Sequence, residues 1–351
     1  MTKPLYYLRW LRKAKNMSEN VATKKIENPS ETLKARKPSK KSTIISLSIV
    51  AVSAIGLGLG AGFFLHNQLA GGVITDYTGI NTNTLVDDDS TLLKTYQSVK
   101  KSGGDYVKAF ADKPYQVANI SFQLYTAHEH CFAQGKGVGK AVALGFAVNQ
   151  QIRSTVIKDG TKYFEESLSL SSAVNLADRM YQEGDQVIRH EGKVDSKNVE
   201  VPANLDKTTT YTLEDYAKAM GRDLDNPCIY IVSSKTTYTD STAKSGAATS
   251  FAKDGDGYQL ELELNPTYSI VNYVKQMQTI SSLYSQPSFQ YVHLSISMDS
   301  DLNLKSLSTH EYYWAATSAT VGSYVEGTLT TTYQTDGNYT IPELMTPITY
   351  A

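Results

Sequence analysis

The stretch AVALGFAVNQQIRSTVIKDGTKYFEESLSLS, residues 141–171, decides how the larger part of this chain folds. Its two halves are rich in apolar and β-branched residues, and they meet at Asp159-Gly160. An Asp-Gly pair between two such runs is the strongest short-range signal for a β-hairpin. We therefore predict two antiparallel strands joined at this turn.

Further strands are predicted on both sides of this hairpin. A second turn, Asp254 to Gly257, precedes the run YQLELELN (residues 258–265), in which leucine alternates with glutamate. That alternation is typical of a strand with one face buried and the other in water. Four other runs are also predicted to be strands: QVANISFQLYT (116–126), FQYVHLSISMD (289–299), LKSLSTHEYYWAAT (304–317) and VGSYVEGTLTTTYQT (321–335).

Four helices are predicted from apolar residues at helical spacing and from capping residues. They are a segment from Leu92 to Val99 that breaks at Ser102-Gly103-Gly104, residues 173–182, a segment after Thr212 that pairs with Asp215 and ends at Gly221, and residues 266–284 with Asn265 as N-cap. Helices beside a sheet of nine to eleven antiparallel strands make an α+β fold.

A membrane-spanning helix is predicted at residues 43–65, a run of 23 residues without charge. At about 1.5 Å per residue such a helix reaches roughly 35 Å, enough to cross a hydrocarbon core of about 30 Å. Gly56, Gly58 and Ala61 match a dinucleotide-binding fingerprint, but that motif needs a short strand before it and an amphipathic helix after it. Neither is present in the sequence pattern, so the membrane interpretation is preferred.

The glycines of this segment suggest contact between helices. Gly56 and Gly60 form a G-x-x-x-G pair, which lets two helix backbones approach closely in lipid and predicts a homodimer through the membrane helix. The alternative is that glycine is simply common in membrane helices.

Charge sets the orientation. Residues 1–41 hold twelve Lys and Arg against three Glu, whereas the whole chain holds 34 basic and 35 acidic residues. The remainder therefore has 22 basic and 32 acidic residues, a net charge of −10. Because basic residues beside a span stay in the cytoplasm, we predict a single-pass cell-membrane protein with its N-terminus inside. A cleaved signal peptide would have a shorter apolar region.

The predicted organisation has four parts. Residues 1–42 form a basic cytoplasmic tail that is mostly disordered, and residues 43–65 form the signal-anchor helix. A juxtamembrane connector and helix follow (66–114), and residues 115–351 form an extracytoplasmic β-rich domain. The basic tail suits the surface of membrane lipid better than nucleic acid, because no recognised nucleic-acid-binding fold is present.

Motifs that suggest chemistry fail on inspection. His128 and His130 in the run HEHC would share one face of a strand, but a zinc site needs three or four ligands. The candidate partners, His190, His293 and His310, are distant in the sequence. The run GKGVGK (135–140) lacks the flanking residues of a phosphate loop and is interpreted as a flexible turn before a strand. We expect no metal, no cofactor and no catalytic residue.

Cys131 and Cys228 are the two cysteines of the chain, and both lie after the predicted span. In an oxidising exterior they can form a disulfide that closes a long loop. The sequence does not show whether their Cα atoms come within about 7 Å, so a bridge and two free thiols both remain open.

The end of the chain resembles a known family. The tight reversal MDSDLNLKSL, then EYYW, then a Gly-punctuated strand rich in Thr and Tyr that ends at IPEL, resembles the LolA/LppX-like lipoprotein-carrier superfamily over residues 115–345. The resemblance implies a large curved sheet, an incomplete barrel, whose helices plug an apolar cavity that binds acyl chains or lipidated peptides. Soluble carriers lack a retained membrane helix, so a fixed binder is implied here.

These observations lead to a functional expectation. We expect a non-enzymatic, anchored domain that binds an apolar or lipid-like ligand, with the helix at 266–284 over the pocket. The apolar stripe of that helix is the candidate ligand contact: Ile270, Val274, Met277 and Tyr284. Ordinary core packing is the alternative role for this stripe. The alternative function is a structural or regulatory subunit that binds an envelope protein.

Overall fold

A computed structural model describes residues 89–143, 146–171, 175–193, 207–220, 243, 249–264, 288–318 and 321–343. The predicted membrane helix with Gly56 and Gly60 lies outside these residues, as does the predicted helix at 266–284. Within the described part of the chain, no helix combines the length and the apolar character needed to cross a membrane.

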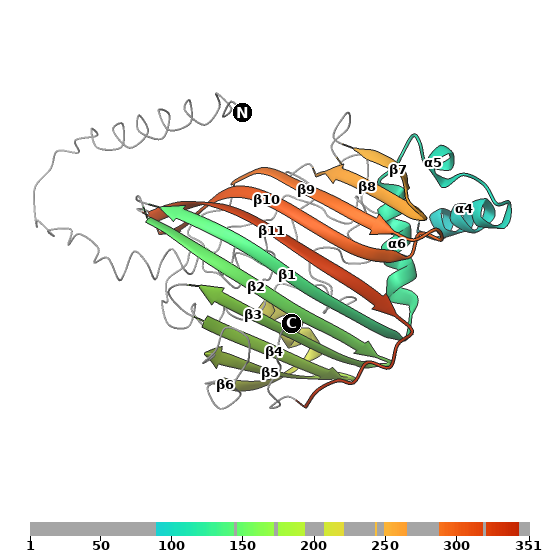
Figure 1. Cartoon of the computed structure of the whole chain (residues 1–351). Helices are drawn as coiled ribbons and strands as arrows, with labels where there is room; N and C mark the ends of the chain where they lie inside the picture. The colour runs from blue at the N-terminus through green and yellow to red at the C-terminus, as the bar shows by residue number, and fades with distance from the viewer. Residues whose placement is uncertain are drawn as a thin grey trace, which may run out of the picture. The chain divides into compact units, whose positions relative to one another are not determined.

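Eleven strands form one antiparallel sheet in the order β6-β5-β4-β3-β2-β1-β11-β10-β9-β8-β7 (Figure 1). β6 and β7 are its two edges, so the sheet is not closed. The strands are β1 (His130–Ala143), β2 (Phe146–Asp159), β3 (Lys162–Ser171), β4 (Asn175–Glu183), β5 (Gln186–Lys193), β6 (Lys207–Thr212), β7 (Ser250–Asp254), β8 (Gly257–Glu263), β9 (Ser288–Met298), β10 (Leu304–Ser318) and β11 (Val321–Thr335). The predicted antiparallel sheet is confirmed.

Both predicted Asp-Gly turns are present. Gly160 connects β2 to β3 with φ +60°, and Gly255 connects β7 to β8 with φ +56°. Glycine adopts this left-handed conformation without the steric penalty of a Cβ atom. The predicted reversal after β9 is also present, where Asp299 Oδ1 accepts hydrogen bonds from the backbone N–H groups of Asp301 (2.8 Å) and Asn303 (2.9 Å).

The first and last strands of the sheet meet at its centre. β1 pairs with β11 at twelve successive positions, from Cys131 opposite Thr335 to Val142 opposite Tyr324. On one side of this strand pair the sheet continues from β1 in sequence order to β6. On the other side it continues from β11 in reverse order to β7.

The described helices are α4 (Asp89–Lys101), α5 (Tyr106–Ala109), α6 (Gln116–Ala127) and α7 (Leu213–Met220). α6 packs on one face of the sheet, which we call the inner face, through a core shared with β8, β9 and β10. The shared core includes Val117 and Ile120 of α6 with Leu260, Leu294 and Leu307 of the sheet. The opposite face is called the outer face.

The predicted helices at 92–99 and after Thr212 are confirmed as α4 and α7. Thr212 Oγ1 accepts a hydrogen bond from the backbone N–H of Asp215 at 3.1 Å and donates one to the Asp215 carboxylate at 3.0 Å. α7 packs on the inner face through Tyr216, which lies in a small cluster with Met180 and Val187.

Three predictions about elements were wrong. Residues 116–126 form helix α6 instead of a strand, although they are rich in β-branched and aromatic side chains. Residues 173–182 contain most of strand β4 instead of a helix. Ala177 to Met180 are all buried, and a strand buried on both faces shows no alternation to distinguish it from a helix.

The third wrong prediction is the turn at residues 135–140, which lies in the middle of β1. Its glycines alternate with Lys136, Val138 and Lys140, whose side chains point to the outer face. A Cβ atom on Gly137 would lie 3.0 Å from the carbonyl oxygen of Thr328 and 3.2 Å from the Leu329 side chain. Glycine is therefore explained here by close packing between strands.

Candidate functional site

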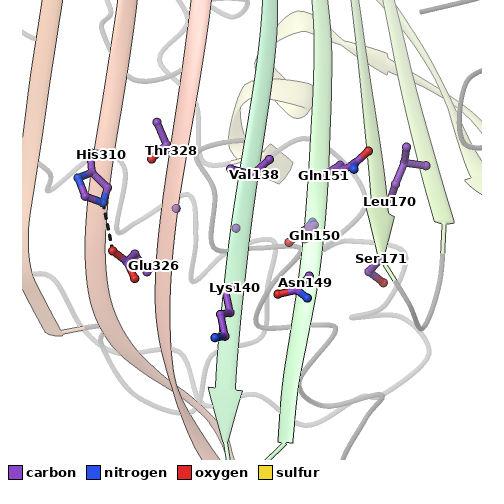
Figure 2. A pocket seen from close by; sticks show the side chains of 12 residues that line it. Val138, Lys140, Asn149, Gln150, Gln151, Leu170, Ser171, His310, Glu326 and Thr328 are labelled. Carbon is purple, nitrogen blue, oxygen red and sulfur yellow. Dashed lines mark hydrogen bonds and ion pairs between the residues drawn. The ribbon is translucent and has the colours of Figure 1, made fainter. Parts of the chain in front are cut away.

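A hollow of about 550 Å³ lies over the central strands β10, β11, β1, β2 and β3 (Figure 2). Its lining is largely polar, with a few apolar side chains and the backbone of two facing glycines, Gly139 and Gly327. Its polar side chains include Lys140, Asn149, Gln151, His310, Glu326 and Thr328.

Strand alternation places these side chains on the outer face. In β11, Val325 and Leu329 are buried in the core with α6, so Glu326 and Thr328 point the other way. In β1, Ala141 belongs to the same core and the neighbouring Lys140 is exposed. The hollow is therefore on the face opposite to α4 and α6.

The strand register arranges the hollow as two rows across the sheet. One row runs from Asn149 through Lys140 to Glu326, each directly opposite the next on adjacent strands. The neighbouring row contains Gln151, Val138, Thr328 and His310 in the same manner. Directly opposed residues have Cβ atoms about 4.5–5.5 Å apart, so side chains within a row can contact one ligand together.

Glu326 contacts His310 of β10 at one side of the hollow. Its Oε1 atom lies 3.3 Å from His310 Nε2, and the Tyr291 hydroxyl lies 3.1 Å from the same nitrogen. Burial raises the pKa of Tyr291, and the nearby Glu326 carboxylate raises it further. The phenol therefore stays protonated and remains a hydrogen-bond donor.

Tyrosines form a stacked row beside this cluster, on three adjacent strands. The rings of Tyr291 and Tyr312 have centroids 6.0 Å apart, and those of Tyr312 and Tyr324 are also 6.0 Å apart. The run EYYW thus divides between the two faces, because Tyr313 is fully buried whereas Tyr312 and Trp314 lie on the outer face. Stacking between strands stabilises the β10 and β11 side of the hollow.

Lys140 has a different environment. Its neighbour across the β1–β11 pair is Glu326, whose carboxylate is turned to His310. Within the described residues Lys140 makes no hydrogen bond or ion pair, and the same holds for Lys136 on the same face of β1. Val138 lies between the two lysines and is 61% exposed.

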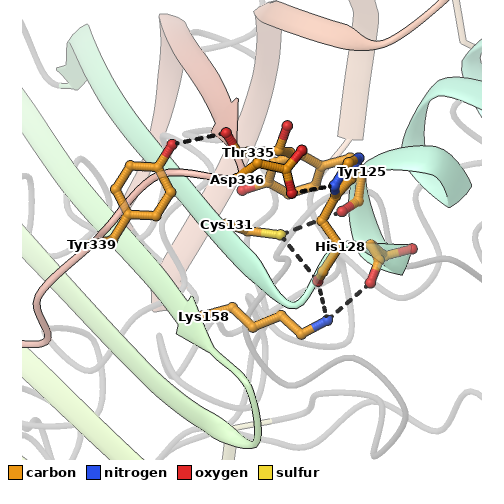
Figure 3. A network of polar contacts seen from close by, with 8 residues as sticks. Tyr125, His128, Cys131, Lys158, Thr335, Asp336 and Tyr339 are labelled. Carbon is orange, nitrogen blue, oxygen red and sulfur yellow. Dashed lines mark hydrogen bonds and ion pairs between the residues drawn. The ribbon is translucent and has the colours of Figure 1, made fainter.

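A second polar cluster surrounds Cys131 at the end of α6 (Figure 3). The thiol donates to the carbonyl oxygens of Tyr125 at 3.3 Å and of His128 at 3.5 Å. Burial raises the pKa of Cys131, which keeps the thiol protonated and unreactive at neutral pH. Cys228 lies outside the described residues, so its pairing with Cys131 stays a prediction.

The two histidines of HEHC do not share a strand face. His128 ends α6 and its Nδ1 lies 2.8 Å from Asp336, whereas His130 begins β1 and its Nδ1 lies 2.9 Å from Asp159. Each imidazole therefore has its own carboxylate partner. In the described ranges no group of three or more His, Cys, Asp and Glu side chains is arranged to hold a metal ion.

Buried charges on β4 and β5 were missed by the sequence analysis. Arg189 is 1% exposed, and its Nε and Nη2 atoms donate to Asp178 at 3.0 and 2.6 Å. Glu191 lies 2.5 Å from Arg189 Nη2 and 3.4 Å from Lys207 Nζ. Burial raises the pKa of Glu191. Two basic side chains thus face two acidic ones, a pattern typical of a structural network.

The other face of β4 holds a second buried pair, in which Arg179 meets Glu166 of the neighbouring strand β3, and both side chains are fully buried. The sequence signal is the adjacent Asp178-Arg179 of β4, whose side chains point to opposite faces, and the alternating Arg189 and Glu191 of β5. A helix at 173–182 does not predict this arrangement.

Several predicted site residues are not placed by the structure. The candidate ligand contacts Ile270, Val274, Met277 and Tyr284 lie outside the described residues, as do Gly56 and Gly60. No family model matches the chain, and no curated protein matches its sequence.

Proposed function

We propose that this chain is a non-catalytic binding domain for an apolar or lipid-like ligand, anchored by its membrane helix and exposed outside the cell. In this proposal the sheet is the curved, incomplete barrel of the LolA/LppX-like carriers, which the sequence resembles. The helix at 266–284 covers its inner face, and the ligand lies between them.

The observation that carries the proposal is the open sheet whose inner face is apolar over strands β8 to β10. Strands β8 to β10 present leucine, isoleucine and valine to that face, where α4 and α6 cover them. The inward residues of β1 in this region are only glycine and alanine, from Ala133 to Ala141. Leu329 lies over two of these glycines. These small residues form an apolar strip along the centre of the open sheet. Such a strip suits a chain-like apolar ligand.

Photo-crosslinking of the full-length protein tests this function. A benzophenone amino acid is placed at Val274 or Met277 in cells, and the purified protein is analysed for lipid adducts by mass spectrometry. We expect adducts at both positions. The control is Lys305, an exposed residue of β10. Equal labelling at Lys305 would show only contact with bulk lipid and would contradict the proposal.

The Gly56 and Gly60 pair favours a second function, a structural subunit of an envelope assembly held together by the membrane helix. The double change Gly56→Ile and Gly60→Ile should then abolish crosslinking between subunits in native membranes. Retained crosslinking would exclude association through this helix face.

A further inference from the structure

The outer-face hollow contains hydrogen-bond donors that the described chain does not use. Four of its lining side chains, Lys140, Asn149, Gln151 and Thr328, make no hydrogen bond or ion pair within the described residues. They come from three adjacent strands and are brought together by the register of β11, β1 and β2.

The charge at this position favours an anion. Within the described part of the chain, the Lys140 ammonium group has no partner, and Glu326, the carboxylate among the lining residues, faces His310 and Tyr291.

The kind of anion follows from the donors. An ammonium, two amide groups and a hydroxyl can all donate to the several oxygen atoms of a tetrahedral phosphate, and hydrogen bonds to a charged acceptor are the strong ones. Val138 adds an exposed apolar surface in the same hollow, between Thr328 and Gln151. That contact favours an organic phosphate ester over inorganic phosphate.

We propose that this outer-face hollow binds a phosphate ester, with Lys140 as the charged anchor and Asn149, Gln151 and Thr328 as neutral donors. The ester is either the head group of a lipid or a free, soluble compound. Because the hollow is on the face opposite to α4 and α6, the proposal stands whether or not a lipid-like ligand occupies the inner face.

Isothermal titration of the full-length protein in a neutral detergent tests the site. The probes are sn-glycerol 3-phosphate, dihexanoyl phosphatidic acid below its micelle concentration, and glycerol. We expect saturable binding of the phosphate esters and none of glycerol. Tighter binding of phosphatidic acid assigns a lipid head group, and tighter binding of glycerol phosphate assigns a soluble ester; both support the site.

Variants distinguish the site from non-specific attraction. Lys140→Gln should weaken binding about tenfold or more, since it removes a charge-assisted hydrogen bond. Lys140→Arg should retain most of the affinity. Lys305→Gln, which changes the net charge by the same amount at an exposed position of β10, should leave binding unchanged. Both positions are exposed, so the unfolding curves of all three variants should match that of the wild type.

Three results would overturn the proposal. They are no saturable binding of either phosphate ester, equal loss of affinity in Lys140→Gln and Lys305→Gln, and binding of glycerol as tight as that of glycerol phosphate. The last result would identify the hollow as a site for neutral polyols or glycans.

Discussion

Lys158 Nζ lies 2.7 Å from the carbonyl oxygen of His128 and 3.0 Å from that of Thr126 (Figure 3). These carbonyl groups are among the last of α6, where the helix has no further backbone donors to satisfy them. The ammonium group also opposes the negative end of the helix dipole. A single side chain of β2 therefore both caps α6 and holds it to the sheet.

Loss of this cap should be measurable as lost stability. Lys158→Met keeps the aliphatic stem and removes the charge, and it should lower the free energy of unfolding by about 1–2 kcal/mol. Urea unfolding followed by circular dichroism measures the change. The matched control is Lys305→Met at an exposed position, expected to stay within about 0.5 kcal/mol. Equal effects of the two substitutions would refute the capping role.

Glu191 should make stability depend on pH. Burial raises the pKa of Glu191 in the folded state. At a pH between the unfolded and the folded pKa, the native protein therefore keeps a proton that the unfolded chain loses. The stability from this group is fully present below the usual Glu pKa of about 4.3 and is lost as pH rises through the raised value. Glu191→Gln should therefore be more stable than wild type at pH 7, and this gain should disappear near pH 4.

Glu183 on the same hairpin provides a control of opposite sign. The Tyr181 hydroxyl and Lys162 lower the pKa of Glu183, so its contribution is present above the usual pKa and is lost as pH falls. Glu183→Gln should slightly lower stability at pH 7 and have no effect in acid. Chemical unfolding at pH 4 and pH 7 measures the change in the free energy of unfolding for each variant. At pH 7 the change should be of opposite sign for Glu191→Gln and Glu183→Gln, and the same sign for both would contradict the assignment.

The fully buried pair of Glu166 and Arg179 should show strong coupling. Arg179→Met leaves a buried carboxylate without its cation and should lower the free energy of unfolding by about 3–5 kcal/mol. The double variant Glu166→Leu with Arg179→Met should recover most of that loss, because no charge remains to desolvate. A double-mutant cycle measures the coupling. Additive losses would show that the two side chains do not depend on each other.

The Cys131 thiol should react slowly in the native protein. Its burial and raised pKa reduce the thiolate fraction, so alkylation by iodoacetamide should be at least about tenfold slower than in denatured protein. Peptide mass spectrometry at Cys131 gives the rate. If Cys131 is bonded to Cys228, the denatured protein will react only after reduction. Fast native labelling would contradict the burial of this residue.

The extent of successful prediction differs between elements for physical reasons. The hairpin at Gly160 and strand β8 were predictable, because Asp-Gly and leucine–glutamate alternation are local signals. Helix α6 was not, since its β-branched and aromatic residues favour a strand until tertiary packing decides otherwise. β4 was missed because burial on both faces removes its alternation.

The hollow illustrates what pattern alone cannot supply. Lys140 was noticed in the sequence as part of a failed phosphate-loop motif. Its neighbours Asn149 and Thr328 lie on two other strands, and only the register of β1 with β2 and β11 brings them together. Register depends on pairings between distant segments, which no local motif encodes.

The pairing of β1 with β11 has a consequence for folding during synthesis of the chain. Of the described strands, β1 leaves the ribosome first and β11 last, yet the two pair with each other at twelve positions. Until Val321 and the residues after it emerge, β1 presents an unpaired edge to any other extended segment nearby. A chain cut short before β11 would be open through the middle of its sheet, and both halves would become targets for proteolysis and mispairing.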